Sequence, residues 1–471
     1  MNLRFVAVVL AALVLITSSA GAEEDRGHAD ALRLDEVMSS LERSFPLLRA
    51  AEVEEAIAAG DVLSAEGGFD VSWKTRATVT PVGYYDSIRA ESTLEKPTSL
   101  WGVSTFAGWK IGRGPLPVYA GGQQTLEYGE LRAGVNVPLW RNGPIDRRRA
   151  TLGRAELGRD VASLSVAEQR IQYRRAAAHR YWAWVAAGRR VAIARELLQN
   201  VEGRDAGLGV RVAHGDLPPV ERTDNARAVE QRRAQVALAD RGLEQAAIEL
   251  GLFVRDPGGK PSIPPAERLP AGLPDPAPSA PTTSAADVSF ALSARPEAKR
   301  LGLQLRQSQL ELDWARNQLA PGVDLQLAGS QDVGRSLASR PDLSKPVVEA
   351  TLLLDIPLQT RLMHGRKDAA SAMVRRLGHQ QTFARDRIEA DVRDAHSAVR
   401  GARERVAATR SEIKLALELE QAERVRFEQG EGHLLIVNIR EQQTAEAELR
   451  EVDALLDYHR ALADLKAARG E

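Results

Sequence analysis

The amino-acid sequence predicts a mainly α-helical protein with a small β part, in which one unit occurs twice. Alanine, arginine, glutamate, glutamine and leucine dominate, and only 5% of the residues are aromatic, which is typical of long helices and coiled coils. Two pairs of segments with alternating polar and apolar residues supply the β part. Two long stretches have an apolar residue at every seventh position, the spacing of supercoiled helices. These residues are Leu157, Leu164, Ile171, Ala178, Val185 and Ala192, then Val392, Val399, Val406 and Ile413.

The overall charge and the absence of cysteine exclude several classes of function. Lysine and arginine (63) nearly balance aspartate and glutamate (64), so the formal net charge is −1. Nucleic-acid modules usually carry a strongly basic face, and we therefore expect no nucleic-acid partner. Without cysteine there is no disulfide, no thiolate catalysis and no thiolate metal site. Lipidation at an N-terminal cysteine is excluded as well.

Residues 1–22 have the pattern of an export signal peptide. Arg4 supplies the positive charge, Val6–Ile16 is apolar, and Ala20-Gly21-Ala22 fits a cleavage site. A transmembrane anchor is the alternative, but the apolar stretch is shorter than the ~20 residues that a spanning helix needs. We therefore expect a cleaved signal and an exported protein.

The first strand pair is predicted at 68–80 and 129–140. In both segments apolar residues alternate with polar ones, so each strand has one face of each kind. Such strands belong either to the edge of a soluble sandwich or to a membrane barrel with lipid outside and water inside, and their length fits both. Residues 81–127 are rich in Gly, Pro and Tyr and lack a sustained period, which indicates an exposed loop. An extra hairpin at 100–111 is the alternative.

The first repeat, residues 23–254, is predicted to end in a helical hairpin at 145–253. Its first helix is expected from about Ile145 to Asn200, because this stretch has no internal proline. Glycines at positions 203, 207, 209 and 215 are expected to break that helix. Asp216-Leu217-Pro218-Pro219 then begins the second helix.

A proline-rich connector, residues 255–285, separates the first repeat from a second at 286–471. The second repeat has the same order of elements as the first. Its strand pair is predicted at 322–330 and 347–357, and its helical hairpin at 366–469. We therefore expect two long antiparallel helical hairpins and four strands in one chain.

Each returning strand ends at a similar joint, where a Pro-Leu pair precedes a glycine and a long helix. The joint residues are Pro138, Leu139, Gly143, Pro357, Leu358 and Gly365. The charge run Arg147–Arg149 after the first joint is either a solvated helix face or a boundary with an anionic surface.

No motif for chemistry is found in the sequence. The eight histidines form neither an HExxH motif nor a helical pair spaced for zinc, and there is no phosphate-binding loop, nucleophile elbow or convincing carboxylate pair. We therefore predict that the protein is not an enzyme and has no catalytic, cofactor-binding or metal site.

The order of elements resembles that of the TolC-like outer-membrane factor family, the exit ducts of efflux pumps and type I secretion systems. The resemblance covers nearly the whole mature chain and is carried by residues 32–56, 136–150 and 426–449. It implies a homotrimer in which each chain gives four strands to one transmembrane β-barrel. It also implies that the helices continue the barrel as a coiled-coil α-barrel, the periplasmic tunnel.

The resemblance places the protein in the outer membrane of a Gram-negative bacterium, with most of its helices in the periplasm. It implies a passive duct, coupled to a periplasmic adaptor (membrane fusion) protein and an inner-membrane transporter. The helical turns would meet these partners at Arg211, Gly215, Asp216, Leu217, Arg426, Phe427, Gly430, His433, Leu434 and Leu435. The alternative function is a soluble periplasmic coiled-coil scaffold or adaptor, because helices dominate the chain.

Overall fold

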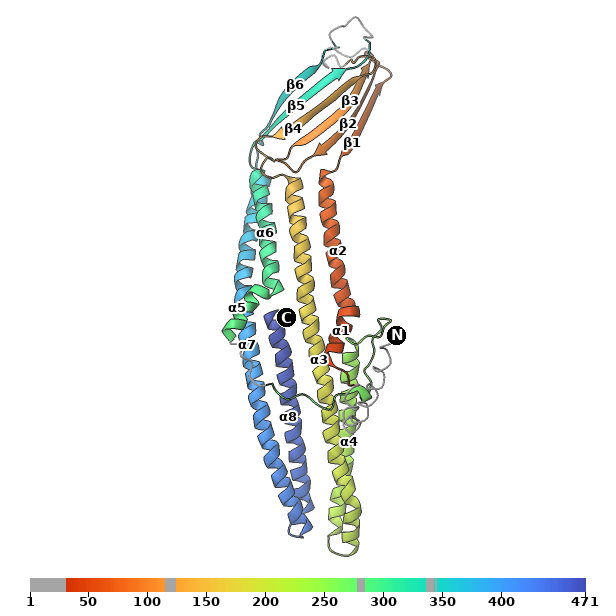
Figure 1. Cartoon of the computed structure of the whole chain (residues 1–471), viewed down its shortest axis with the longest axis vertical. Helices are drawn as coiled ribbons and strands as arrows, with labels where there is room; N and C mark the ends of the chain where they lie inside the picture. Colours follow the sequence, from red (N-terminus) through yellow and green to blue (C-terminus); the bar gives the residue numbers. More distant parts are fainter. Residues whose placement is uncertain (1–30, 115–123, 278–283, 336–342, 344) are drawn as a thin grey trace, which may run out of the picture. The chain divides into compact units, whose positions relative to one another are not determined.

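The computed structural model describes residues 31–114, 124–277, 284–335, 343 and 345–471. They form two compact units (Figure 1). The helical unit takes the chain up to Arg49 together with Gln169–Arg295 and Ile388–Glu471, and the sheet unit takes Ala50–Glu168 and Pro296–Arg387. Each unit therefore draws on both predicted repeats. The predicted signal peptide lies outside the described residues.

The sheet unit contains one antiparallel sheet and the helix segments that lead into and out of it. Neighbouring strands in the sheet follow the order of the sequence, from the first strand to the sixth. Its strands are β1 (Ser72–Thr80), β2 (Ser87–Pro97), β3 (Ser104–Arg113), β4 (Glu130–Pro138), β5 (Gly322–Asp332) and β6 (Val347–Asp355). Its helices are α2 (Pro46–Glu66), which begins in the helical unit, and α6 (Pro296–Asn317).

The sheet has six strands, so the prediction of four strands was wrong. β2 and β3 lie in the segment interpreted as an exposed loop, and they join through a turn in which Thr98 N donates to Val103 O over 2.8 Å. Ser92 interrupts the apolar series of β2, which hid the alternation in the sequence. In the fold Ser92 accepts a 2.6 Å hydrogen bond from Trp73 Nε1 on β1. The Ser92 hydroxyl therefore has its hydrogen-bond partner on a neighbouring strand, and the residue pattern of β2 alone does not reveal that partner.

The helical unit is formed by parts of two very long helices and by four shorter ones. α3 (Arg147–Ala213) and α7 (Arg361–Glu428) have 67 and 68 residues, or roughly 100 Å each at the usual helical rise, and both begin in the sheet unit. The others are α1 (Leu34–Ser44), α4 (Pro219–Gly251), α5 (Ser284–Ala294) and α8 (Leu434–Arg469). Among the described residues, no helix combines the length and the apolar character needed to cross a membrane.

Two expectations about the long helices were wrong. α3 continues through Gly203, Gly207 and Gly209, and only Gly215 follows its end. Each glycine in a helix costs about 1 kcal/mol relative to alanine, but buried packing of Val201 and Leu208 on the same helix offsets this. α7 begins at residue 361 rather than 366, so the second joint is shorter than expected.

Apolar residues at coiled-coil spacing hold the helices of the helical unit together. Ala186, Ile193 and Leu197 of α3 form one buried cluster with Ala445, Val452 and Leu456 of α8. In both triplets the intervals are seven and four residues, which places all six side chains on facing stripes. Smaller clusters join α3 to α4 and α7 to α8. The four helices are therefore neighbours in the order α4, α3, α8, α7.

The proline-rich connector is docked on the helical unit. Leu273 packs against both the α3–α8 cluster and the α7–α8 cluster. His459 of α8 stacks on Trp182 of α3 and donates from Nε2 to Pro274 O over 2.9 Å, and Ala277 N donates to Tyr458 Oη over 3.1 Å. The connector is thus a structural part of the unit, although its prolines prevent a helix.

Acid is expected to weaken the docking of the connector. Burial lowers the pKa of His459 below its usual value of about 6.5. Because the unfolded chain binds this proton more readily, the stabilisation is complete above about pH 6.5 and is lost as the pH falls through the lowered pKa. The midpoint of thermal unfolding, measured by circular dichroism, should fall between pH 7 and pH 5. His459→Phe, which keeps a ring against Trp182, should remove part of this dependence; an unchanged pH profile would contradict the assignment.

Candidate functional site

Most of the large apolar side chains of the six strands lie on one face of the sheet, whereas Phe106, Val347 and Leu353 lie on the opposite face. Cross-strand pairing aligns Trp73, Leu94, Ala107, Ala133, Gly329 and Val348 in one row, and every second residue along each strand follows them. We call this the apolar face. Its larger members are Trp73, Val79, Ile88, Leu94, Trp109, Ile111, Leu131, Val135, Val137, Leu325, Leu327, Val348, Leu352 and Leu354.

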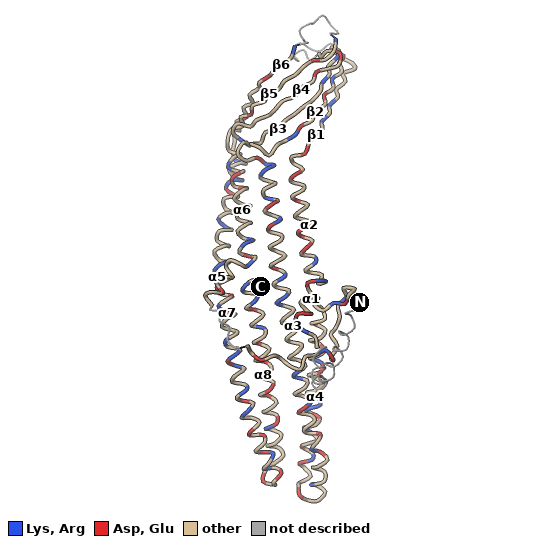
Figure 2. The backbone as a smooth tube through the Cα atoms, in the orientation of Figure 1, with Lys and Arg blue, Asp and Glu red and all other residues tan. Residues whose placement is uncertain are grey.

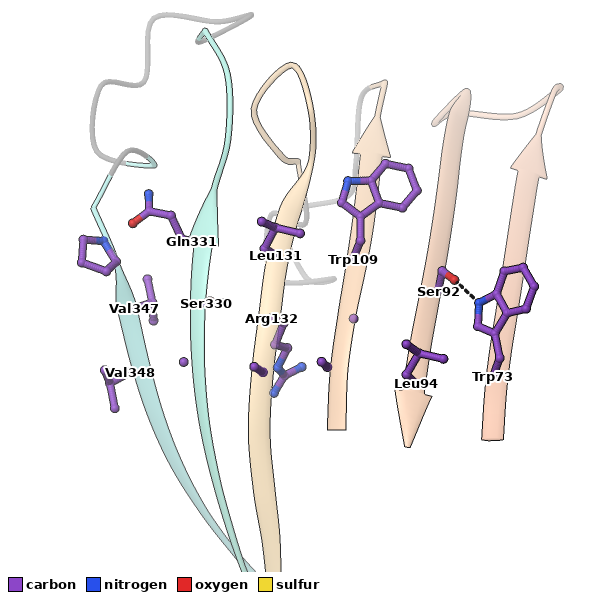
Figure 3. Close-up of a pocket in the computed structure, with 15 residues that line it drawn as sticks. Trp73, Ser92, Leu94, Trp109, Leu131, Arg132, Ser330, Gln331, Val347 and Val348 are labelled. Atoms are coloured by element: carbon purple, nitrogen blue, oxygen red, sulfur yellow. Dashed lines mark hydrogen bonds between the residues drawn. The ribbon is translucent and has the colours of Figure 1, made fainter. Parts of the chain in front are cut away.

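The apolar face is uncovered in the isolated chain. Val348 is 84% exposed, and Leu352 and Leu354 are each 64% exposed. A shallow hollow of about 1010 Å³ extends across the face and takes residues from every strand; Figure 3 shows Trp73, Trp109 and Leu131 there. Soluble monomers rarely expose so continuous an apolar surface. Lipid or another protein is therefore needed to cover it.

The opposite face of the sheet, the polar face, carries charges in pairs. Lys74 Nζ lies 2.6 Å from Glu95 Oε2, and Lys110 Nζ lies 2.7 Å from Glu130 Oε2. Arg132 of β4 reaches across β5 to Glu349 of β6 over 3.2 Å. Figure 2 shows that charged residues of both signs occur along the strands. The sheet therefore has one mainly apolar face and one face with ion-paired side chains.

The two edges of the sheet are open. Among the described residues, β1 pairs only with β2 and β6 only with β5. Every residue of β6 is exposed. The outer N–H and C=O groups of both edge strands therefore have no strand partner, and such edges are covered or paired in stable proteins.

The first joint is a closely bonded turn. Trp101 Nε1 donates to Pro138 O over 2.9 Å, and Leu139 N donates to Val323 O over 2.7 Å. A Cβ on Gly143 would lie only 2.8 Å from Trp101 Nε1, so a larger residue does not fit there. These contacts tie the end of β4 to β5 and to the turn between β2 and β3.

Arg149 folds back onto this joint. Its guanidinium donates to Asn142 O over 2.9 Å and to Gly143 O over 2.6 Å. Asp146 accepts from Arg149 N over 3.0 Å and so caps the first turn of α3. For this arginine the structure shows a structural role, whereas a solvated face or an anionic boundary was expected of the run.

The second joint differs from the first. Leu358 is 96% exposed, and Pro357 precedes it outside any strand or helix. Gly365 lies inside α7 with open space around it, so it does not correspond to Gly143. The repeated sequence pattern therefore produces one tightly bonded joint and one open joint.

The two helical turns, by contrast, have the same backbone conformation. Gly215 and Gly430 have φ angles of 83° and 80°, in the left-handed region that favours glycine. The residue after each glycine donates to the carbonyl five positions earlier: Asp216 to Arg211 O and Glu431 to Arg426 O, both over 2.9 Å. This is the Schellman motif at the end of a helix. The positions differ by 215 residues in every case, as the sequence repeat predicts.

The turns also contact one another. Phe427, Leu434, Leu208 and Val437 form a buried cluster against which Leu217 packs. The Arg211 guanidinium lies 5.1 Å from the centre of the Phe427 ring, a cation–π contact. Leu434 has no exposed surface in this packing, whereas Leu435 is 47% exposed. Among the predicted tip residues, Gly215, Asp216, Arg426, Gly430, His433 and Leu435 are exposed.

These features were compared with known proteins. No protein-family model matches the chain, and no curated protein matches it in sequence. Solved structures do match. The outer membrane protein VceC from Vibrio cholerae has a TM-score of 0.67 at 14% identity, covering 93% of this chain and 96% of its own. A membrane protein from Pseudomonas aeruginosa has a TM-score of 0.66 at 17% identity, with 93% and 92% covered. The MtrE outer membrane channel of Neisseria gonorrhoeae, in its open state, has a TM-score of 0.64 at 20% identity, with 93% and 89% covered.

The chain has the fold of these outer-membrane channels. With 66% of the described residues helical and one antiparallel sheet, the structure confirms the predicted class, mainly α with a small β part. The similarity to these solved structures confirms the resemblance stated from the sequence. Of these three proteins, MtrE is an outer membrane channel. The described residues of the present chain include no group of His, Asp or Glu side chains that could hold a metal ion.

Sequence reasoning missed a buried charge network in the helical part of this channel fold. Arg204 of α3 donates from Nη1 and Nη2 to the two carboxylate oxygens of Glu441 on α8, over 2.8 and 2.7 Å. Arg424 of α7 lies 3.3 Å from the same carboxylate, and Arg232 of α4 donates to Asn438 O over 3.4 Å. The network thus joins all four long helices.

Burial sets the energetics of this network. The Glu441 side chain is only 2% exposed, and desolvation lowers the pKa of the neighbouring Arg232. Because two arginines contact this one carboxylate, removing the carboxylate is expected to destabilise the network. Arginine and glutamate are common on every helix of this chain, so the sequence had no signal that distinguished these members.

Proposed function

We propose that the protein is a TolC-like outer-membrane exit duct for an efflux or type I secretion system. The observation that carries the proposal is the continuous apolar face of a sheet whose two edges are open. An open edge cannot face lipid, because its N–H and C=O groups would lack partners. Pairing of β6 of one copy with β1 of the next removes both edges. In a homotrimer this closes a transmembrane β-barrel with the apolar face toward lipid.

The rest of the chain fits a passive conduit. The ion-paired polar face would line a water-filled bore, and the long helices would continue it as a tunnel into the periplasm of a Gram-negative bacterium. The signal peptide would direct export, and the barrel alone would anchor the protein, since there is no cysteine to lipidate. The first predicted repeat then supplies four strands and the second supplies two, and each supplies one helical hairpin. The proposal requires no reaction and no cofactor.

The partners we propose are a periplasmic adaptor protein and an inner-membrane transporter, which would meet the helical turns. The Schellman turns at Gly215 and Gly430 support this, because both have the same backbone conformation and both carry exposed residues. Asp216, His433 and Leu435 are exposed there and available for contact. Leu434 and Phe427 instead hold the two turns together.

Membrane fractionation tests the duct against the soluble scaffold. We expect the mature protein in the outer-membrane fraction, released only by detergent, with a native mass of three chains. Recovery in the periplasmic extract without detergent would favour a scaffold and refute the duct. The exposed apolar face speaks against that outcome, since a soluble scaffold would leave it in water.

A further inference from the structure

The hairpin formed by β2 and β3 gives this chain two strands more than the four that a TolC-like duct implies. On the basis of the proposed duct, we infer that this hairpin is part of the membrane wall. The closed sheet of three copies then has eighteen strands in place of twelve. Since the diameter of a barrel grows roughly linearly with its number of strands, the bore in the membrane would be about one and a half times wider. The hairpin would therefore widen the part of the duct that crosses the membrane.

Backbone pairing places the hairpin inside the sheet. β2 pairs with β1 from Ser72 opposite Glu95 to Thr80 opposite Ser87, along the whole of β1. β3 pairs with β4 from Ser104 opposite Asn136 to Lys110 opposite Glu130. β1 is thus connected to β4 only through the hairpin, and removing the hairpin from the wall would break both ladders.

The side chains of the hairpin follow the same division as the other strands. Ile88, Ala90 and Leu94 of β2 lie on the apolar face, in rows with Val79, Ala77 and Trp73 of β1. Ala107 and Ile111 of β3 continue the rows of Leu94 and Ala90, while Trp109 lies opposite Ser92 and Arg113 opposite Ile88. A hairpin standing in water would have no reason to keep its apolar residues on the face that meets lipid.

Ion pairs on the polar face join the hairpin to both neighbours. The Lys74–Glu95 pair links β1 to β2, and the Lys110–Glu130 pair links β3 to β4. Both lie on the side that would face the bore. The hairpin therefore contributes charge to the bore as well as width, which favours hydrated polar cargo over apolar cargo.

The alternative is a wall of four strands per copy from which the hairpin is displaced. Such an arrangement is geometrically conceivable, because Trp73 and Ala133 lie in the same cross-strand row. Two inserted strands preserve both the antiparallel direction and the face. The alternation alone therefore does not separate the two walls, and an experiment must locate the hairpin in the membrane.

Single cysteines locate it, because the natural chain has none. The test pair is Ala90→Cys on the apolar face of β2 and Glu91→Cys on its polar face. The reference pair is Leu327→Cys and Gln326→Cys on β5, which belongs to the wall in either arrangement. Each full-length variant is placed in lipid vesicles and exposed to a hydrophilic, membrane-impermeant maleimide. Fluorescently labelled protein is then tested with a quencher dissolved in the lipid.

We expect both pairs to behave alike. The polar-face cysteines should react at least about tenfold faster than the apolar-face ones, since contact with lipid raises the pKa of a thiol and one unit removes nine-tenths of the thiolate. Only the apolar-face labels should be quenched. Fast reaction at both 90 and 91, with normal alternation at 326 and 327, would overturn the inference and leave the duct intact. Loss of alternation at 326 and 327 would refute the membrane wall itself.

Electron cryomicroscopy of the assembled protein in lipid nanodiscs provides the second measurement. Eighteen strands around three copies would support the inference even if a cysteine variant failed to assemble. Twelve strands with the hairpin outside the wall would overturn it. A copy number other than three would contradict the proposed trimer, and the count of strands per copy would still decide whether the hairpin belongs to the wall.

Discussion

Glu441→Ala is expected to destabilise the helical unit by about 3–5 kcal/mol, the usual effect of removing one partner from a buried ion pair. The substitution leaves Arg204 and Arg424 without the carboxylate that both contact, in a site where Glu441 has almost no access to water. The midpoint of thermal unfolding of the detergent-solubilised protein should therefore fall by several degrees. Because an oligomer of this size does not unfold in two states, the midpoint is compared rather than an absolute free energy.

Glu412→Ala is the matched control for this effect. Glu412 pairs with Arg450 between α7 and α8 over 2.7 Å, but both side chains are about half exposed. Pairs of this kind contribute about 0–1 kcal/mol. Equal midpoints for the two variants would show that the buried network does not stabilise the contact between the α3–α4 and α7–α8 helical hairpins. Glu441→Gln should lie between them, since the amide keeps one acceptor but loses the charge.

Leu327→Arg is expected to abolish stable insertion of the protein into the membrane. Leu327 lies on the apolar face in the middle of β5, between Val135 and Ala350. An arginine facing lipid near the middle of a bilayer costs about 2–4 kcal/mol. Three copies repeat this cost in one assembly. The fraction of the protein recovered as a heat-resistant oligomer in the outer membrane measures the effect.

Gln326→Arg, one residue earlier on the same strand, is the control. Gln326 lies on the polar face between Asn136 and Thr351, so a charge there would point into water. This variant should assemble normally. If both variants assembled equally well, or if Gln326→Arg alone failed, the assignment of the two faces would be wrong.

Elements whose pattern is local could be predicted from the sequence. β1, β4, β5 and β6 were found because one set of alternate positions in each is mainly apolar, and the two turns because a glycine follows the same Val-Arg pair in both. β2 was missed because Ser92 breaks its alternation, and the hydrogen bond that satisfies Ser92 comes from another strand. A pattern within one segment contains no information about its neighbour.

Features that depend on contacts between distant segments could not be predicted. α3 continues through three glycines because the packing of Val201 and Leu208 offsets the low helix propensity of the glycines. Arg204 and Glu441 are separated by 237 positions, and only the fold brings them together. The joint shows the same limit, because Gly365 matches Gly143 in the sequence pattern but lies inside a helix.

The docked connector has a mechanical consequence. Asp275 pairs with Arg410 of α7, Pro274 binds His459 of α8, and Leu269 lies against Gly188 of α3 so closely that a Cβ on the glycine would clash. The connector therefore contacts three neighbouring helices, α3, α8 and α7. If these helices moved apart at this level, the connector would be stretched and its contacts would have to break. The helical unit would thus resist widening most strongly where the connector crosses these helices.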